Sequence, residues 1–377
     1  MTEPIAPFTP DWASPPGESI VDILEERGWS QSELAQRLGY TEKHVSLLVN
    51  GKVALSMDAA LRLEHVLGST ADFWLALETN YQKHNARLES MKLHASWVPW
   101  LDELPLRDLM RSGAIPKQRI DAKHMPGLVD ACLRFFGVAS PEEWRAHYGG
   151  MQLSFRRSRA EQSDIGAISS WLRLGERKVE KLDVPKYNRD RFEKALHVIR
   201  SLTFDTPEVF EPQMRRLLQE AGVLFVLVPS IPRAHVSGVA RWMSGTRPLI
   251  QLSLYGKTND KFWFTFFHEA AHILLHATNK DEKKSVFLDD PNAIDSNNKQ
   301  EREANEWAAN YLIPNSNTRL LPGLKTKTAV VTFAQQIGVH PGIVVGRLQH
   351  DGLIQLSWMN DLKKTFRFRK TFSSKIT

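Results

Sequence analysis

The stretch FTFFHEAAHILLH, residues 264–276, places three histidines and a glutamate in an otherwise apolar run. Polar side chains are costly to bury in a helix core unless they find partners. His268 and His272 are four residues apart, so on an α-helix both imidazoles lie on one face and can reach a single point. H-E-x-x-H on a helix is a pattern of zinc ligands, in which the glutamate beside the first histidine accepts a proton from water. The stretch therefore predicts a helix over 260–277, with His268 and His272 as metal ligands and Glu269 as general base.

A second helix, expected over 300–313, can supply the third ligand. Glu301 and Asn305 are four residues apart and share a face of that helix, so we expect Glu301 to bind the metal and Asn305 to support it by hydrogen bonding. Ala304 and Ala308 are small enough to let the two helices approach closely. Three protein ligands leave one coordination position for water, which hydrolysis requires. We expect Zn²⁺ at this site, with another divalent ion such as Mn²⁺ as the alternative.

Other polar residues near these helices are assigned by their spacing. His276 lies one turn beyond His272 and is expected to contact the ligands rather than the metal, because three ligands already suffice. Glu303 points to another side of its helix than Glu301 and is expected to fit a metal site worse. His235 is a candidate donor to the oxyanion of a tetrahedral intermediate, with an ordinary surface or hairpin histidine as the alternative.

Short β-rich stretches precede the first helix. VLFVLVP (223–229), VSGVARWM (236–243) and PLIQLSL (248–254) are separated by Pro, Gly and Ser, which predicts a small antiparallel sheet. The last of them suits an edge strand, to which an extended substrate could add by backbone hydrogen bonds. GLIQLSW (352–358) is predicted as a further strand.

These motifs resemble those of the ImmA/IrrE family of zinc-dependent endopeptidases, over about residues 213–350. The matching stretches are FHEAAHILLH (267–276) and EREANEWAANYLIP (301–314), where Trp307 stands in place of the family's usual Phe. The tail GVHPGIVVGRLQHDGLI (338–354) resembles the family's C-terminal helical extension. The resemblance implies a minimal zincin fold and cleavage of a transcriptional repressor or antitoxin. It also implies zinc at His268, His272 and Glu301, with Glu269 as general base.

A second motif lies near the N-terminus. Ser30 and Glu33 form a capping box at a helix start. Beyond it, a small residue, a turn glycine and two apolar residues have the spacing of a helix-turn-helix, namely Ala35, Gly39, Val45 and Leu48. Thr41 is expected to cap the second of these helices. The candidate DNA contacts are then Lys43, His44, Ser46 and Asn50, with Lys52 near a phosphate.

Residues 18–84 resemble the HigA-type antitoxin branch of the XRE-type helix-turn-helix proteins, most closely in SMDAALRLEHVLGSTADFWLALETNY (56–81). The resemblance implies binding to double-stranded DNA as a homodimer, and a toxin as a further partner. Charge argues against DNA, because residues 1–90 hold seven Lys/Arg against thirteen Asp/Glu. A helical protein-docking module that keeps this fold is the alternative.

Composition bounds the class of protein. The 377 residues are 42% hydrophobic and 24% charged, with a formal net charge of +6 and one cysteine, Cys132, so no internal disulfide can form. We find no secretory signal pattern at the N-terminus and no apolar run of about 18–20 residues. We therefore expect a cytoplasmic protein with no membrane partner.

We expect an α+β fold that is mostly α. Its predicted parts are a flexible arm (1–18), an all-helical helix-turn-helix domain (19–88), a helical connector (89–205), a metallopeptidase domain with a small sheet (206–360) and a basic tail (361–377). The small–Gly–Val spacing of the N-terminal motif recurs at Ala334, Gly338 and Val344. We interpret this recurrence as helix packing within the metallopeptidase domain rather than as a second DNA reader.

The predicted function is a DNA-binding transcriptional regulator with zinc-dependent endopeptidase activity, which cleaves a repressor, an antitoxin or its own chain in a stress response. One alternative is a non-enzymatic antitoxin or repressor whose metal only braces the fold. Glu269 argues against it, because a structural zinc site usually closes its fourth position and needs no such carboxylate. Another alternative is a nucleic-acid sensor that uses the basic middle region, residues 90–205, in which residues 151–200 hold twelve Lys/Arg against seven Asp/Glu.

Overall fold

The chain divides into two compact units in a computed structural model, which describes residues 14–155, 164–244, 246–253, 258–276, 287–289 and 299–366. The first unit comprises Met1–Val98 with Met125–Gly127, and the second comprises Pro99–His124 with Leu128–Thr377. Most of the predicted arm and of the predicted basic tail lies outside the described residues. The fold is α+β and mostly helical, as the sequence predicts.

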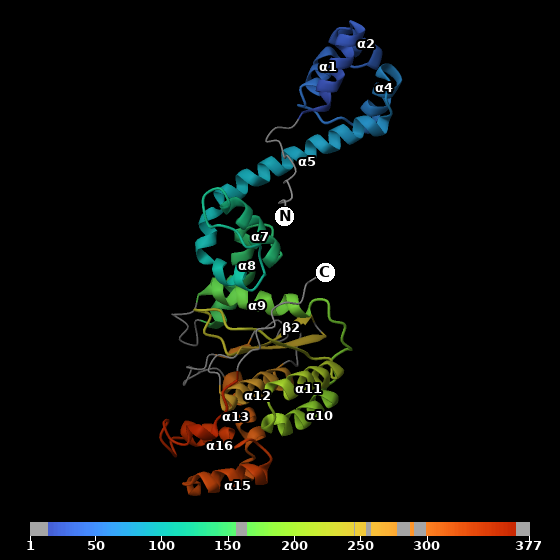
Figure 1. Cartoon of the computed structure of the whole chain (residues 1–377). Helices are drawn as coiled ribbons and strands as arrows, with labels where there is room; N and C mark the ends of the chain where they lie inside the picture. Colours follow the sequence, from blue (N-terminus) through green and yellow to red (C-terminus); the bar gives the residue numbers. More distant parts are fainter. Residues whose placement is uncertain are drawn as a thin grey trace, which may run out of the picture. The chain divides into compact units, whose positions relative to one another are not determined.

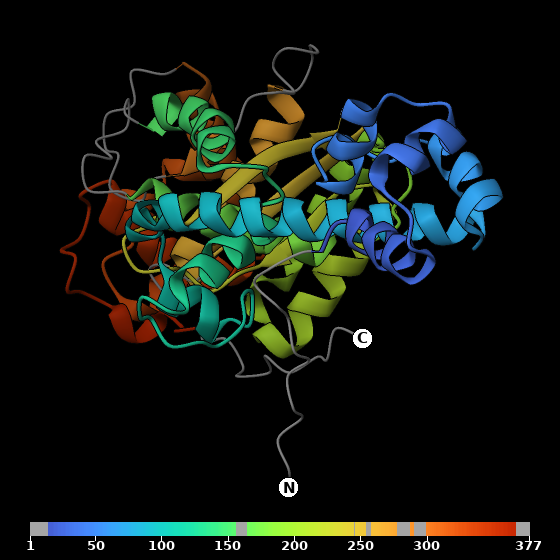
Figure 2. The same ribbon diagram turned by 90° about the horizontal axis from the view of Figure 1, so that it is seen from above.

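Side-chain caps fix where the helices of the first unit begin. Ser30, Thr41, Ser56 and Thr70 each accept a hydrogen bond from the backbone N–H three residues further on. Gly39 ends one helix in the left-handed conformation, at φ 71°. The helices are α1 (Pro16–Arg27), α2 (Gln31–Leu38), α3 (Glu42–Val49), α4 (Met57–Leu67) and α5 (Ala71–Ser96). In both overall views α5 is one continuous rod (Figures 1 and 2).

From residue 98 onward, the described chain forms further helices and a small sheet. Up to the sheet they are η1 (Val98–Glu103), α6 (Leu106–Arg111), α7 (Met125–Phe136), α8 (Pro141–Phe155), α9 (Ile165–Val179), α10 (Arg189–Ser201), η4 (Leu202–Phe204) and α11 (Pro207–Glu220). After the third strand come α12 (Asn259–Leu275), α13 (Lys299–Leu312), α14 (Asn315–Thr318), η6 (Leu321–Gly323), α15 (Lys327–Ile337), α16 (Pro341–His350) and η7 (Asn360–Leu362).

The described strands form one mixed sheet in the order β1-β3-β2-β4. Their bounds are β1 (Leu224–Leu227), β2 (Gly238–Ser244), β3 (Arg247–Leu252) and β4 (Phe287–Asp289). β1 pairs with β3 in parallel, so the prediction of a purely antiparallel sheet is wrong. β3 lies between β1 and β2, so its predicted place at the edge is also wrong, and β1 and β4 are the edges among the described strands.

Helices cover both faces of this sheet, with α9 on one side and α11 and α12 on the other (Figure 1). Alternate residues of β2 contact the helices on opposite faces of the sheet, because successive side chains of a strand point to opposite faces. Val239 belongs to the cluster formed with α9, whereas Ala240 belongs to the larger core that contains α12. On the α9 side, Arg241 forms a buried ion pair with Glu176 of α9 at 2.6 Å.

A short segment near the end of the described chain, residues 363–366, binds the start of α12, and we call it the C-terminal strap. Lys363 pairs with the buried Asp260 at 2.6 Å. The Lys364 N–H donates to Asn259 Oδ1 at 3.0 Å, and Thr365 forms an antiparallel bridge with Thr258. The helix that carries the H-E-x-x-H motif is therefore held at its N-terminus by chain that follows it by about a hundred residues.

The recurrence at Ala334, Gly338 and Val344 lies in α15 and α16. These two helices are bent by 112°, and Gly338 joins them at φ 70°. Val344 is fully buried in the core, and α16 packs against α12, so this pair acts in packing. Among the described helices no single one passes the length and hydropathy test for a membrane span, and α15 and α16 pass it only as a bent pair.

The prediction of a strand at 352–358 is wrong. These residues form turns, and two of their side chains face solvent, with Leu356 76% and Trp358 46% exposed. The Gln349 amide donates to the carbonyls of Leu356 and Trp358, which satisfies backbone groups that a strand would offer to a neighbour.

Candidate functional site

Two packed helices bring the predicted metal ligands together. His268 and His272 lie on α12, where both are 1% exposed. Glu301 lies in the first turn of α13. Ala304 and Ala308 on α13 are fully buried, and the two helices are in contact, as expected for small residues at a close crossing.

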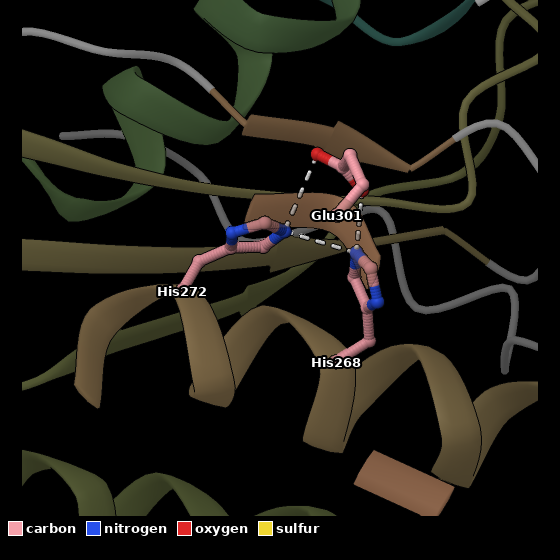
Figure 3. A group of neighbouring side chains, drawn as sticks. All are labelled: His268, His272 and Glu301. Carbon is pink, nitrogen blue, oxygen red and sulfur yellow. Dashed lines mark hydrogen bonds and ion pairs between the residues drawn. The ribbon is translucent and has the colours of Figure 1, made fainter. Parts of the chain in front are cut away.

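The ligand atoms of these three residues have the spacing of zinc ligands (Figure 3). Glu301 places Oε2 at 3.2 Å from His268 Nε2 and Oε1 at 3.5 Å from His272 Nε2, and the two Nε2 atoms are 3.0 Å apart. Ligands at 2.0–2.1 Å from a tetrahedral ion lie about 3.3–3.4 Å from one another. Two imidazoles and one carboxylate also form a ligand set of hydrolytic zinc sites, so these residues fit Zn²⁺.

The protonation states suit metal binding. Burial lowers the pKa of His272 to about 4, although its hydrogen bond with Glu301 acts in the opposite direction. Burial opposes ionisation of Glu301, but hydrogen bonds with His268 and His272 outweigh it and hold the pKa of this carboxyl well below its ordinary value. At neutral pH the imidazole of His272 is neutral and Glu301 is ionised, which are the forms that bind metal.

Glu269 lies against strand β2. Its side chain is fully buried. A β-carbon added at Gly238 would lie 2.7 Å from Glu269 Oε1, which is closer than real β-carbons approach other atoms. Glycine at this position therefore lets the backbone of β2 reach the carboxylate and confine it.

His276 and Glu303 extend the site away from the metal ligands. The Nδ1 atoms of His272 and His276 are 3.1 Å apart, and His276 Nε2 is 3.0 Å from Glu303 Oε2. The contact of Glu303 with His276 is not predicted from the sequence, where Glu303 is assessed only as a metal ligand. The one-turn spacing from His272 to His276 is the signal that could have found it, since a buried imidazole needs a partner.

Asn305 and His235 are the remaining predicted site residues of this domain. Asn305 is half-buried one turn after Glu301, and within the described residues no hydrogen bond joins the two. His235 is half-buried three residues before β2, with its backbone in the left-handed region at φ 49°. Among the described residues the group that could hold a metal consists of the two imidazoles and Glu301, and His235 is not part of it.

In the first unit, α2 and α3 form the helix-turn-helix. Ala35 is 2% exposed, and Val45 is fully buried. α1 crosses α3 so closely that a β-carbon at Gly17 would lie 1.7 Å from the Val49 carbonyl oxygen. Apolar burial and this contact fix the orientation of α3 within the domain.

The predicted DNA contacts lie on or just after α3. Lys43, Ser46, Asn50 and Lys52 are exposed. Asn50 Nδ2 donates to the Ser46 carbonyl at 2.7 Å, and the half-buried His44 packs its ring on Tyr40 at 4.7 Å. Glu42, whose charge opposes phosphate, accepts a hydrogen bond from Ser32 at 2.5 Å.

Comparison with known proteins agrees with both motifs. A model of helix-turn-helix domains matches residues 20–74, and a model of the IrrE N-terminal-like domain matches residues 225–349. The uncharacterized HTH-type transcriptional regulator YddM of Escherichia coli is 35% identical over 63 residues, which are 17% of this chain and 67% of that protein. Antitoxin HigA-1 of Vibrio cholerae is 38% identical over 63 residues, which are 16% of this chain and 59% of that protein.

These matches confirm the two family resemblances drawn from the motifs. The helix-turn-helix match covers α1 to α4 and the start of α5, and the IrrE-like match covers the sheet, α12, α13 and most of α16. The chain belongs to the helix-turn-helix family of regulators through its N-terminal domain, and its C-terminal domain is similar to the IrrE N-terminal-like domain of a metallopeptidase-like family.

Proposed function

We propose that this protein is a DNA-binding transcriptional regulator that also cleaves a polypeptide by zinc-dependent hydrolysis. The observation that carries the proposal is the meeting of His268, His272 and Glu301 at zinc-ligand distances, in the same core as the buried Glu269. A site that only braces a fold does not need a carboxylate in the position of Glu269.

The chain's own residues then divide the chemistry between them. A zinc ion, when bound, supplies a Lewis acid for the scissile carbonyl and lowers the pKa of water at its open position. Glu269 would accept a proton from the attacking water molecule and would return it to the leaving amine as the peptide bond breaks. Its burial against Gly238 holds the carboxylate in one orientation and keeps bulk water away from it.

A polypeptide substrate can add to the sheet at β4. Asp289 of β4 pairs with Gly238, so this edge strand runs beside the part of β2 that contacts Glu269. Backbone hydrogen bonds to an edge strand hold a substrate extended, as a protease requires. This assignment replaces β3, which is an interior strand.

The proposed substrate is a repressor, an antitoxin or the chain itself. The helix-turn-helix domain would bring the cleavage site to regulated DNA, in the cytoplasm and as a homodimer. Support for an antitoxin setting comes from the similarity to Antitoxin HigA-1, which concerns the N-terminal domain alone.

Cleavage is tested by incubating the purified full-length chain with zinc, alone and with a peptide library made from a bacterial proteome. We expect new N-termini, identified by mass spectrometry, with the wild type and none with Glu269→Gln. Glu306→Gln is the matched control, because Glu306 is exposed on α13 and the change removes the same charge. Identical fragment patterns from wild type and Glu269→Gln would exclude the enzyme.

The second candidate is a non-enzymatic antitoxin in which the metal braces the C-terminal domain. The specific observation in its favour is the 38% identity of the N-terminal domain to an antitoxin. In that case Glu269→Gln leaves the function of the chain unchanged, whereas His272→Gln removes both the metal and the stability of the domain.

DNA binding is tested at Lys52, which we propose to contact phosphate, while Lys43, His44, Ser46 and Asn50 face the bases. We expect Lys52→Ala to reduce the dependence of log K on log salt by about 1, because one phosphate contact is lost. Lys83→Ala, which removes the same charge from an exposed position on α5, leaves that slope unchanged. Equal slopes for both variants would remove Lys52 from the interface.

A further inference from the structure

Helices α10 and α11 of the second unit lie side by side, and a groove of about 730 Å³ runs between them (Figure 1). Its floor is apolar, because Ala195 and Ala221 are 5% and 1% exposed and Leu217 is half-buried. Val198 lines the same groove and is 45% exposed. Exposed apolar surface that is rimmed by polar groups is characteristic of an interaction site.

Backbone contacts fix one end of this groove. The Asn188 N–H donates to the Ala221 carbonyl at 3.0 Å, which joins the start of α10 to the end of α11. Gly222 follows at φ 79°, and a β-carbon added there would lie 2.7 Å from the Pro185 carbonyl oxygen. The loop before α10 is therefore packed tightly onto the end of α11, so the two helices hold the groove preformed.

The rims of the groove are positively charged. Arg191 and Lys194 of α10 and Arg216 of α11 line it, against one carboxylate, Glu220. Arg216 and Glu220 form an exposed pair at 3.8 Å. Among the residues that the structure describes, neither Arg191 nor Lys194 has an ion-pair partner. These two cations on one face of α10 are therefore available to an anionic group.

We propose that this groove binds an acidic amphipathic helix of a partner protein. Arg191, Lys194, Ala195 and Val198 have the i, i+3, i+4, i+7 spacing of one helix face, so the groove runs along about two turns of α10. A helix laid in such a groove places its apolar residues on the floor and its charged residues at the rims. Its glutamates and aspartates would meet the three rim cations. This proposal does not depend on the metal site.

Charge and shape argue against other occupants of the groove. The same face of a second copy would place like charges opposite one another, which opposes association. A small ligand would stay largely in water between two exposed rims, whereas small-molecule sites bury most of their ligand. Nucleic acid would satisfy the cations through its phosphates but has no apolar group for the floor. An acidic amphipathic helix matches both the rims and the floor.

The first experiment measures, by fluorescence anisotropy, the binding of a labelled peptide to the full-length chain. The probe is a designed helix of about 18 residues, with a leucine stripe flanked on both sides by glutamates. We expect saturable binding that Val198→Asp weakens about tenfold, because a carboxylate then lies in the apolar strip and faces the glutamates. The matched control is Val209→Asp on α11, outside the groove and also 45% exposed, which leaves the affinity unchanged. Both variants should melt like the wild type, which separates binding from folding.

The second experiment tests the charges with the same assay. We expect Arg191→Glu combined with Lys194→Glu to weaken binding of the glutamate probe at least about tenfold, and to bind instead a matched probe that carries lysine in place of glutamate. The loss should shrink in high salt, since exposed charges are screened. Lys92→Glu reverses the charge of an exposed residue on α5 and should leave both affinities unchanged.

Several results would overturn this proposal. Equal affinity of Val198→Asp and the wild type excludes the groove as the binding site, and equal affinity of the wild type for both probes excludes recognition of acidic residues. Absence of saturable binding of the glutamate probe excludes the helix as occupant, and binding of decanoate in that case, measured by calorimetry, assigns the groove to a small anion. Self-association of the full chain that Arg191→Glu with Lys194→Glu abolishes assigns the groove to a second copy instead of a partner protein.

Discussion

Gly238 is the residue that ties the sheet to the proposed general base. An added β-carbon would lie 2.7 Å from Glu269 Oε1 and from Thr265 Cγ2, and 2.8 Å from Leu252 Cδ2. We expect Gly238→Ala to displace the Glu269 carboxylate and to lower the free energy of unfolding by about 1–3 kcal/mol, as overpacking does. We expect the rate of peptide cleavage to fall at least about tenfold. Complete loss of a general base costs about 10²–10⁴-fold, and a displaced base costs part of that. Zinc affinity should be retained.

Peptide cleavage, chelator competition and urea unfolding measure these three quantities for Gly238→Ala. The control is Gly323→Ala, where an added β-carbon meets nothing within 4 Å and the backbone is not left-handed. Full cleavage activity in Gly238→Ala would contradict the assigned contact with Glu269.

The buried His340 should make the stability of the protein depend on pH. Its Nδ1 accepts hydrogen bonds from the Gly342 N–H at 3.0 Å and from Asn259 Nδ2 at 2.8 Å, which an imidazolium cannot do. Burial, and then the charge of Lys364, lower the pKa of His340 to about 4. Because the unfolded chain takes up a proton below its higher pKa of about 6.5, stability is lost as pH falls from about 6.5 toward 4, by about 2–3 kcal/mol.

Urea unfolding of the zinc-free chain at several pH values measures this loss. His340→Asn keeps a side-chain cap on α16 but has no titrating group, so its stability should depend less on pH over this range. The exposed His197→Asn is the control and should follow the wild type. A His340→Asn profile parallel to the wild type would show that His340 does not titrate as described.

At this scale, local geometry decides what can be predicted from the sequence. The shared face of His268 and His272 follows from helical periodicity alone. Meeting Glu301 required only that two helices pack through Ala304 and Ala308. The contact between His276 and Glu303 depends on side-chain rotamers on two helices, and helical periodicity does not specify those.

At the scale of secondary-structure elements, a buried polar network binds helix α9 to the sheet. Arg241 of β2 pairs with Glu176 at 2.6 Å and donates to the Leu172 carbonyl at 3.0 Å. Gln251 of β3 donates to the Trp171 carbonyl at 2.7 Å. The connector predicted from sequence thus contains a helix that closes one face of the sheet.

Neutralising one charged residue of this network should lower the free energy of unfolding. Glu176→Gln leaves Arg241, which is 5% exposed, without its counter-charge, and we expect a loss of about 3 kcal/mol in the free energy of unfolding. The double variant with Arg241→Met should recover most of it, since removing both charges relieves the unpaired one. Glu220→Gln breaks an exposed pair with Arg216 and should change stability by less than about 0.5 kcal/mol in urea unfolding. A loss below about 1 kcal/mol for Glu176→Gln would contradict the network's role.

Strand positions follow from sequence better than strand order. The three predicted stretches before α12 contain β1 and cover all but one residue each of β2 and β3, since each is a short β-rich run between turn residues. Their neighbours are set by long-range packing, so the parallel pairing of Leu224 with Leu249 left no local signal. The strand expected at 352–358 has apolar residues at the right spacing, but the Gln349 amide takes its carbonyls.

At the scale of the whole molecule, the metal site lies entirely within the second unit. Zinc should therefore raise the unfolding temperature of that unit and leave the helix-turn-helix unit unchanged. At a free zinc concentration 100 times the dissociation constant, binding adds about 2.7 kcal/mol. Calorimetry of the full chain with zinc and with a chelator measures the shift, and His272→Gln should abolish it. A zinc shift in the transition of the first unit would contradict a site confined to the second.

The C-terminal strap imposes an order on protein synthesis. Lys364 follows its partner Asn259 by 105 positions. At 5–20 residues per second the ribosome needs about 5–20 s to make that interval. In the later part of this interval the nascent chain carries His268, His272 and Glu301 but has no Lys363 to neutralise Asp260. The helix that carries His268 and His272 is therefore made before the segment that holds its N-terminus, so packing of this domain is not complete until residue 364 has been added.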